Sequence, residues 1–206
     1  MFALFAVICL IVCCPAYADE SDYTQITGEI KDGLYINRTL GAEAYFDENW
    51  RVLSRKDIAT LTGAAASDSP ALEELTSGAM PVFCVSTKDG RANINITVIH
   101  LGVSASLLSD PDSVFMDMFA ESARNGAANV LTEMGIKDFT AERMKTSFLG
   151  EEYHSVYSTS KLNGFINQYQ KLVICIRGEY SITVTATSLG RDAIDEMLSM
   201  FRRIGS

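Results

Sequence analysis

The sequence predicts an α+β fold in which helices pack on a mainly antiparallel sheet. Three observations lead to this prediction. The dipeptide Asp89-Gly90 separates two β-rich runs and is a strong hairpin signal. Four strand-like runs follow one another through short turns between residues 138 and 187, and they must be antiparallel because a parallel pair needs a crossover of about a dozen residues or more. Two amphipathic helical patterns, over 111–134 and 190–203, supply the helices that would cover such a sheet.

The chain begins with a predicted signal peptide over residues 1–18. Phe2 to Cys14 is apolar throughout but too short for a membrane-spanning helix of about 20 residues. Ala16-Tyr17-Ala18 has the small-x-small pattern of a signal peptidase site, although no Lys or Arg precedes the apolar run. We expect cleavage after Ala18. An uncleaved anchor and a lipid attached at Cys13 or Cys14 stay open as alternatives.

We expect the exported part to consist of a flexible lead-in over 19–32 and a single domain over 33–206. Residues 33–46 carry the signals of two short strands, and an acidic turn then precedes a strand that begins at Trp50. The 206-residue chain is 48% hydrophobic and 21% charged, close to a globular average, so a folded domain with its own core is expected.

The remaining elements follow from capping signals and from periodicity. The predicted helices cover 54–63, 70–76, 111–134 and 190–203. The predicted strands cover 81–87, 92–101, 138–149, 151–161, 164–177 and 180–187. In the longest helix the stripe expected to face the core is Phe115, Met118, Phe119, Ser122, Ala123, Ala127, Val130, Leu131 and Met134. In the last helix the corresponding stripe is Ile194, Met197, Leu198 and Phe201.

Five short segments carry a resemblance to a known family. They are Gly33-Leu34-Tyr35-Ile36-Asn37 with Leu40-Gly41, Trp50 after its acidic turn, Phe148-Leu149-Gly150-Glu151-Glu152-Tyr153, the hairpin turn Gly178-Glu179-Tyr180, and Met200-Phe201-Arg202-Arg203-Ile204. In this order they resemble a Mog1/PsbP-like domain, and in particular a small exported bacterial (DcrB-like) member. The resemblance covers residues 33–205 and departs from the family where Asp47-Glu48-Asn49 replaces a proline expected before the tryptophan. It implies a three-layer α-β-α sandwich, and it implies little chemistry because a fold does not determine a function.

The charge of the chain limits its partners. The net charge is −9, and residues 1–18 contribute none of it. An acidic surface repels phosphate backbones and anionic membranes, so we expect no nucleic-acid partner and no stable membrane insertion after cleavage. The expected partner is an unknown protein or small ligand met outside the cytoplasm, in the secreted or cell-envelope space.

Two cysteines, Cys84 and Cys175, follow the signal segment. An even pair in an exported protein can form a disulfide. Both lie within apolar strand-like runs, where a free cysteine is an ordinary small core residue. We favour two buried thiols.

No catalytic motif stands out in the exported part. A triad would need one of the two histidines, and Cys84–His100 and Cys175–His154 are conceivable pairs. The string Gly102-Val103-Ser104-Ala105-Ser106 lacks the final glycine of a nucleophile elbow. We predict no catalytic residues.

Metal, cofactor and modification signals are equally weak. Glu152 and His154 share a strand face beside Glu151 but lack a third identifiable zinc ligand. Asp110, Asp112 and Asp117 lack the spacing of a calcium loop. We predict no metal site and no cofactor. Two triplets, at Asn37 and Asn95, fit the glycosylation sequon, and the aromatic residues Trp50, Tyr35 and Tyr45 are either core or a ligand site.

Two functional hypotheses follow. The first is a non-catalytic extracytoplasmic binding or accessory protein of the cell envelope. The second is a small envelope hydrolase using Glu151, Glu152 and His154, which requires these side chains to converge in one pocket.

Overall fold

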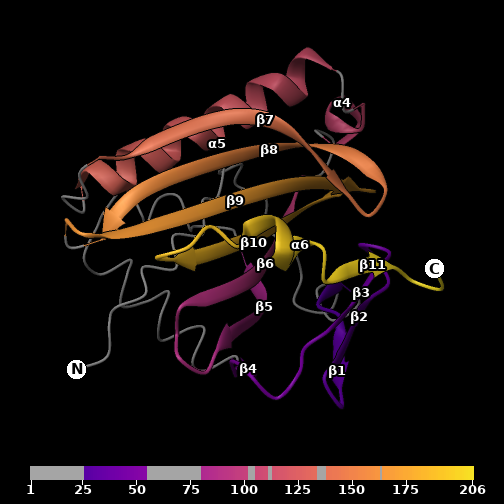
Figure 1. The fold of residues 1–206 in the computed structure, drawn as a ribbon. Helices are drawn as coiled ribbons and strands as arrows, with labels where there is room; N and C mark the ends of the chain where they lie inside the picture. Colours follow the sequence, from indigo (N-terminus) through magenta and orange to yellow (C-terminus); the bar gives the residue numbers. More distant parts are fainter. Residues whose placement is uncertain (1–25, 55–79, 102–104, 111–112, 134–137, 163) are drawn as a thin grey trace.

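A computed structural model describes residues 26–54, 80–101, 105–110, 113–133, 138–162 and 164–206, which form a sheet-dominated α+β fold (Figure 1). The predicted signal peptide and nearly all of the two predicted helices over 54–63 and 70–76 lie outside the described residues. The prediction of a mainly antiparallel sheet is confirmed, since every strand pair in the described part is antiparallel.

The larger of two sheets has seven strands in the order β4-β5-β6-β10-β9-β8-β7. These strands are β4 (Trp50–Val52), β5 (Met80–Thr87), β6 (Ala92–His100), β7 (Thr140–Phe148), β8 (Glu151–Leu162), β9 (Ile166–Arg177) and β10 (Tyr180–Leu189). The predicted hairpin around Asp89-Gly90 is confirmed, with β5 and β6 paired across it. The run from β7 to β10 forms a meander of hairpins. Strand β10 also pairs with β6, which joins the meander to the hairpin of β5 and β6.

A smaller sheet has four strands in the order β1-β2-β3-β11. They are β1 (Glu29–Lys31), β2 (Leu34–Asn37), β3 (Ala42–Tyr45) and β11 (Phe201–Arg203). The strand pair predicted within 33–46 is therefore present, and β1 extends the sheet into the segment expected to be a lead-in.

The predicted helix over 190–203 is wrong for most of its length. Helix α6 spans only Ile194–Leu198, and the chain then forms β11, which pairs with β3. The reason is a tertiary contact with a segment far away in the sequence. Phe201 lies opposite Ala44 in this ladder, and β3 offers hydrogen-bonding groups that a sequence pattern does not show.

The long helix is present as α5 (Val114–Glu133), preceded by the short α4 (Ala105–Leu108). The prediction of which side chains of this helix are buried is wrong for the first turns of the helix. Phe115 and Met118 are 51% and 63% exposed, whereas Met116 and Ala120 are buried. Helix α5 runs along β7 and β8 at the margin of the large sheet (Figure 1), so a narrow stripe of the helix suffices to contact it.

Helix α5 and the small sheet lie on opposite faces of the large sheet. On β8, His154 approaches Asp117 of α5, whereas its neighbour Tyr153 contacts Arg177 on the side of β11, and successive side chains of a strand point to opposite faces. The three-layer α-β-α sandwich stays a prediction, because the face opposite α5 carries a small sheet and the five-residue α6.

The main core lies between the two sheets and is rich in aromatic rings. Tyr35 stacks on Phe83 with 3.9 Å between ring centroids, and Phe46 contacts the rings of Phe83, Trp50 and Phe201. Tyr35 is fully buried and Trp50 packs against this core, whereas Tyr45 is 62% exposed. Tyr35, Trp50 and Tyr45 thus do not line a common site.

Replacing Gly33 by alanine should destabilise the domain by more than the backbone strain of an alanine at positive φ would by itself. Gly33 has a φ of +81°, and an added Cβ would lie 2.5 Å from the carbonyl oxygen of Phe46. We expect a loss of about 2 kcal/mol or more in the free energy of unfolding, measured by urea denaturation. Gly190→Ala is the matched control, because Gly190 has the same φ with open space around it. Equal losses in the two variants would contradict the predicted clash.

Candidate functional site

An open cleft lies where β11 and the turn between β2 and β3 meet the large sheet. Its volume is about 560 Å³, and it is lined by Arg38, Thr39, Leu40, Gly41, Leu149, Glu151, Tyr153, Arg177, Arg203 and Ile204. Three of these residues are arginines, so we call it the arginine cleft. A second cavity of about 410 Å³ lies between β7 and α6 and shares Leu149 with the first.

Strand ends bring the charged side chains of the cleft together. Glu151 is the first residue of β8, and Tyr153, two residues on, points to the same face. Arg177 ends β9 and Arg203 ends β11. Leu149 and Gly150, both with positive φ (51° and 77°), form the tight turn that starts β8 at this place.

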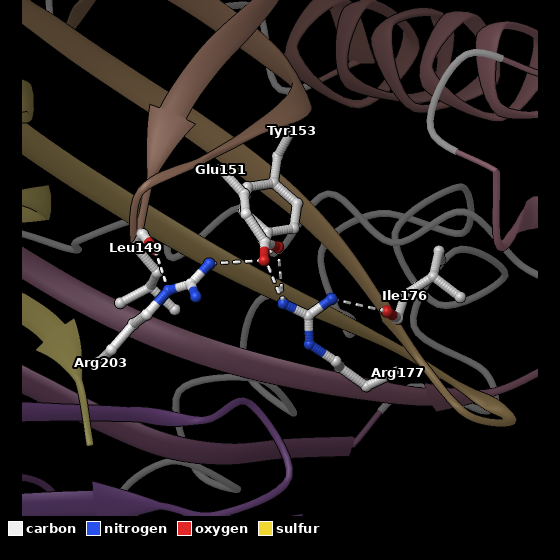
Figure 2. A network of polar contacts seen from close by, with 6 residues as sticks. All are labelled: Leu149, Glu151, Tyr153, Ile176, Arg177 and Arg203. Carbon is white, nitrogen blue, oxygen red and sulfur yellow. Dashed lines mark hydrogen bonds and ion pairs between the residues drawn. The ribbon is translucent and has the colours of Figure 1, made fainter. Parts of the chain in front are cut away.

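A continuous polar network joins four of these side chains (Figure 2). Arg203 donates through Nε to the carbonyl oxygen of Leu149 and through Nη2 to Glu151 Oε1, both at 2.5 Å. The Tyr153 hydroxyl donates to Glu151 Oε2 at 2.6 Å and accepts a hydrogen bond from Arg177 Nη2. Arg177 Nη2 also lies 3.5 Å from Glu151 Oε2. One carboxylate therefore fixes two guanidinium groups.

The network determines the protonation of its members. The hydrogen bond from Tyr153 and the charges of Arg203 and Arg177 hold the pKa of Glu151 below its usual range. Burial and the hydrogen bond to Glu151 raise the pKa of Tyr153 to about 12. Cys175 lies on the same face of β9 as Arg177, and burial raises its pKa to about 12. At neutral pH the carboxylate is ionised while the phenol and the thiol keep their protons, so these three groups are poorly suited to proton transfer.

The cleft is locally positive although the chain is acidic. Three guanidinium groups face one carboxylate there, against a net charge of −9 for the whole chain. Arg38 is exposed, and within the described part of the chain no carboxylate pairs with it. The arrangement is suited to binding an anion, because guanidinium groups recognise carboxylates and phosphates with paired hydrogen bonds.

The lowered pKa of Glu151 predicts how the effect of replacing this residue on the stability of the fold changes with pH. Because the pKa is lowered in the folded state, the carboxylate stabilises the fold above the ordinary glutamate pKa of about 4.3, and this contribution is lost as pH falls through the lower folded value. Glu151→Gln should therefore be less stable than the wild type near neutral pH, and the difference should shrink in acid. Denaturation curves between about pH 3 and pH 7 test this.

Glu152→Gln is the control, since Glu152 is an exposed neighbour on β8. A stability difference for Glu151→Gln that is the same at every pH would contradict the role given to its charge.

The structure does not bring the predicted hydrolase residues together. Glu151 lies in the arginine cleft, whereas Glu152 and His154 alternate to the opposite face of β8. His154 is buried, with Nδ1 3.7 Å from Asp117 Oδ1 of α5. A shared pocket for all three is therefore excluded by the strand geometry.

The conceivable cysteine–histidine pairs are also separated. Cys84 pairs with Asn95 of β6, five residues and roughly 16 Å along that strand from His100. Cys175 faces the small sheet while His154 faces α5. Both cysteines are buried and neither forms a disulfide, which confirms the prediction of two buried thiols. Residues 102–104 of the serine-containing string lie outside the described residues.

The other sequence signals are placed as follows. Asp117 pairs with Arg143 at 3.4 Å, and Asp112 lies outside the described residues. Within the described ranges no group of three or more His, Cys, Asp or Glu side chains could hold a metal ion. Asn37 and Asn95 of the two sequons are buried, so the fold leaves no room for a glycan on either side chain. No helix in the described part of the chain is both long enough and apolar enough to cross a membrane.

Sequence reasoning missed Arg38, Arg177, Arg203 and the role of Tyr153. These residues come from separate segments, and no local motif marks them. The available signal was the position of each arginine near a turn or strand end, which becomes informative only when the strand order is known.

Comparisons with known proteins find solved structures that are similar at low sequence identity. No family model matches the chain, and no curated protein matches it. Among solved structures, it is similar to cyanobacterial PsbP (CyanoP) from Synechocystis sp. PCC 6803, with 12% identity, a TM-score of 0.46, and coverage of 82% of this chain and 89% of that one. It is also similar to LpqN, involved in cell envelope biogenesis of Mycobacterium tuberculosis, with 11% identity, a TM-score of 0.38, and coverage of 77% and 75%.

A third similar structure is the Ran-binding protein Mog1p of Saccharomyces cerevisiae, with 8% identity, a TM-score of 0.33, and coverage of 77% of each chain. At these TM-scores the likeness carries no functional argument, and membership of the family stays a prediction.

Proposed function

We propose that this chain is a non-catalytic binding or accessory protein of the cell envelope that holds an anionic group of its partner or ligand in the arginine cleft. The observation that carries the proposal is the network in which Glu151 and Tyr153 fix Arg177 and Arg203 at the wall of an open cleft of about 560 Å³. Pockets of about 300–1,000 Å³ are the usual size for ligand sites. Guanidinium groups that are already fixed lose less side-chain entropy when a ligand binds.

The proposed location outside the cytoplasm rests on the predicted signal peptide over residues 1–18. The proposal also takes the chain as a small exported, DcrB-like member of the Mog1/PsbP-like domains with a three-layer sandwich. The alternative hydrolase is not proposed, because its three residues lie on two faces of β8.

The binding part of the proposal is tested by titrating the protein with inorganic phosphate and with citrate while following arginine Nε–H signals by NMR. We expect the signals of Arg38, Arg177 and Arg203 to shift saturably. Arg91 and Arg191, exposed arginines paired with Asp89 and Glu196, serve as internal controls. No shift at the cleft with either anion, or equal shifts at all five arginines, would overturn the proposal.

The non-catalytic part is tested with ester and phosphate-ester substrates. We expect no hydrolysis above background and no effect of Glu152→Ala or His154→Ala. A measured hydrolytic rate that falls in either variant would overturn this part, provided that circular dichroism shows the variant folded.

A further inference from the structure

We propose that the anion held in the arginine cleft is the phosphoryl group of a phosphate monoester. This inference rests on the proposed function and specifies its ligand class. The charge of the cleft is the first argument. Three guanidinium groups face the single carboxylate of Glu151, which leaves an excess of two positive charges. A phosphate monoester carries nearly two negative charges at neutral pH, because its second pKa is about 6.

The directions from which the arginines enter are the second argument. Arg38 comes from the turn between β2 and β3, Arg177 from the end of β9, and Arg203 from the end of β11. A carboxylate has two oxygens in one plane and is satisfied by one or two guanidinium groups. A phosphoryl group presents three terminal oxygens in a tetrahedral arrangement, so it can accept hydrogen bonds from three separate arginines.

The third argument concerns the N–H groups of Arg177 and Arg203 that form no hydrogen bond within the network. Arg203 uses Nε and Nη2 for Leu149 and Glu151, and Arg177 uses Nη1 and Nη2 for Ile176, Tyr153 and Glu151. Among the described residues, Nη1 of Arg203 and Nε of Arg177 have no protein acceptor. Both guanidinium groups are therefore held in place and still carry free N–H groups.

The rest of the cleft suits the organic part of an ester. Leu149 and Ile204 lie beside the arginines, and Ile204 is 44% exposed. Apolar side chains next to a cationic wall accommodate a small carbon skeleton attached to a charged group. The phosphoryl group could belong to a soluble ester or to the headgroup of a lipid such as phosphatidic acid.

The test measures binding to the protein expressed from the full chain, by calorimetry at pH 7.5. Glycerol 3-phosphate is the probe, and succinate is a dicarboxylate of similar charge. We expect glycerol 3-phosphate to bind at least about tenfold more tightly than succinate, and Arg38→Ala and Arg203→Ala each to weaken it about tenfold. Arg91→Ala, an equal charge change at an exposed hairpin turn, should leave affinity unchanged.

Arg38 has no protein partner in the described part of the chain, so Arg38→Ala keeps the fold and remains a valid test if Arg203→Ala does not fold. Unchanged affinity in Arg38→Ala would overturn the inference.

The two possible sources are distinguished with phosphatidylcholine vesicles that contain phosphatidic acid. Arg38-dependent sedimentation with these vesicles assigns the ligand to a lipid, and binding of glycerol 3-phosphate alone assigns it to a soluble ester. Both results support the inference. Succinate or citrate binding as tightly as glycerol 3-phosphate would overturn it and leave the proposed function standing, whereas no cleft response to any anion removes both.

Discussion

Replacement of Phe201 by alanine is expected to lower the free energy of unfolding by about 3–5 kcal/mol, the usual loss for a buried phenylalanine. Phe201 is 5% exposed, and its ring lies 5.7 Å from the ring centroid of Phe148 and 6.2 Å from that of Phe46. It thus joins the small sheet to the large one. The loss combines the removed apolar contact with the cavity left behind, and urea denaturation monitored by fluorescence measures it.

Phe165→Ala is the matched control, because Phe165 is 75% exposed in the turn between β8 and β9. We expect its change to stay within about 0.5 kcal/mol. If Phe201→Ala cost no more than Phe165→Ala, the pairing of β11 with β3 and the core built on it would be wrong.

Alkylation of Cys175 in the native protein is expected to be slower than in the unfolded chain by a factor on the order of 10³ at pH 8. Only the thiolate reacts, and burial raises the pKa of Cys175 to about 12. At pH 8 this leaves about one thiol in 10⁴ ionised, against about a quarter for an ordinary thiol with a pKa of about 8.5. Lack of access to the buried sulfur slows the reaction further.

The measurement is iodoacetamide labelling followed by peptide mass spectrometry, so that Cys175 is read separately from the other cysteines. The same chain in urea supplies the reference rate. Labelling in buffer at a rate near that reference would show that the inner face of β9 is accessible, and the core between the sheets would then need revision.

Local signals predicted the strands of the large sheet well. The hairpin of β5 and β6 follows from Asp89-Gly90, and the turn at Gly178-Glu179 correctly separates β9 from β10. Such hairpins form between neighbours in sequence, so alternation and turn residues contain nearly all the information that they require. The buried state of Cys84 and Cys175 follows from the same apolar runs.

The predictions failed where the partner of a segment lies far away in sequence. Phe201 stands at helical spacing from Ile194, yet it forms a strand because β3, more than 150 residues earlier, supplies its hydrogen-bond partners. The face of α5 was misjudged because the helix contacts only the margin of the sheet. Periodicity gives the apolar side of a helix but not the width of the surface that it meets.

The sequence by itself determined an antiparallel, sheet-rich α+β domain, a long helix between its strands, and two buried thiols, because these depend on local turns, periodicity and apolar runs. Only the tertiary structure decided which charged residues meet. Glu151 and His154 belong to one strand but point to opposite faces, whereas Glu151 and Arg203 are 52 residues apart and form an ion pair. A site assembled from strand ends depends on strand order and register, and these are set by long-range pairing that no local pattern records.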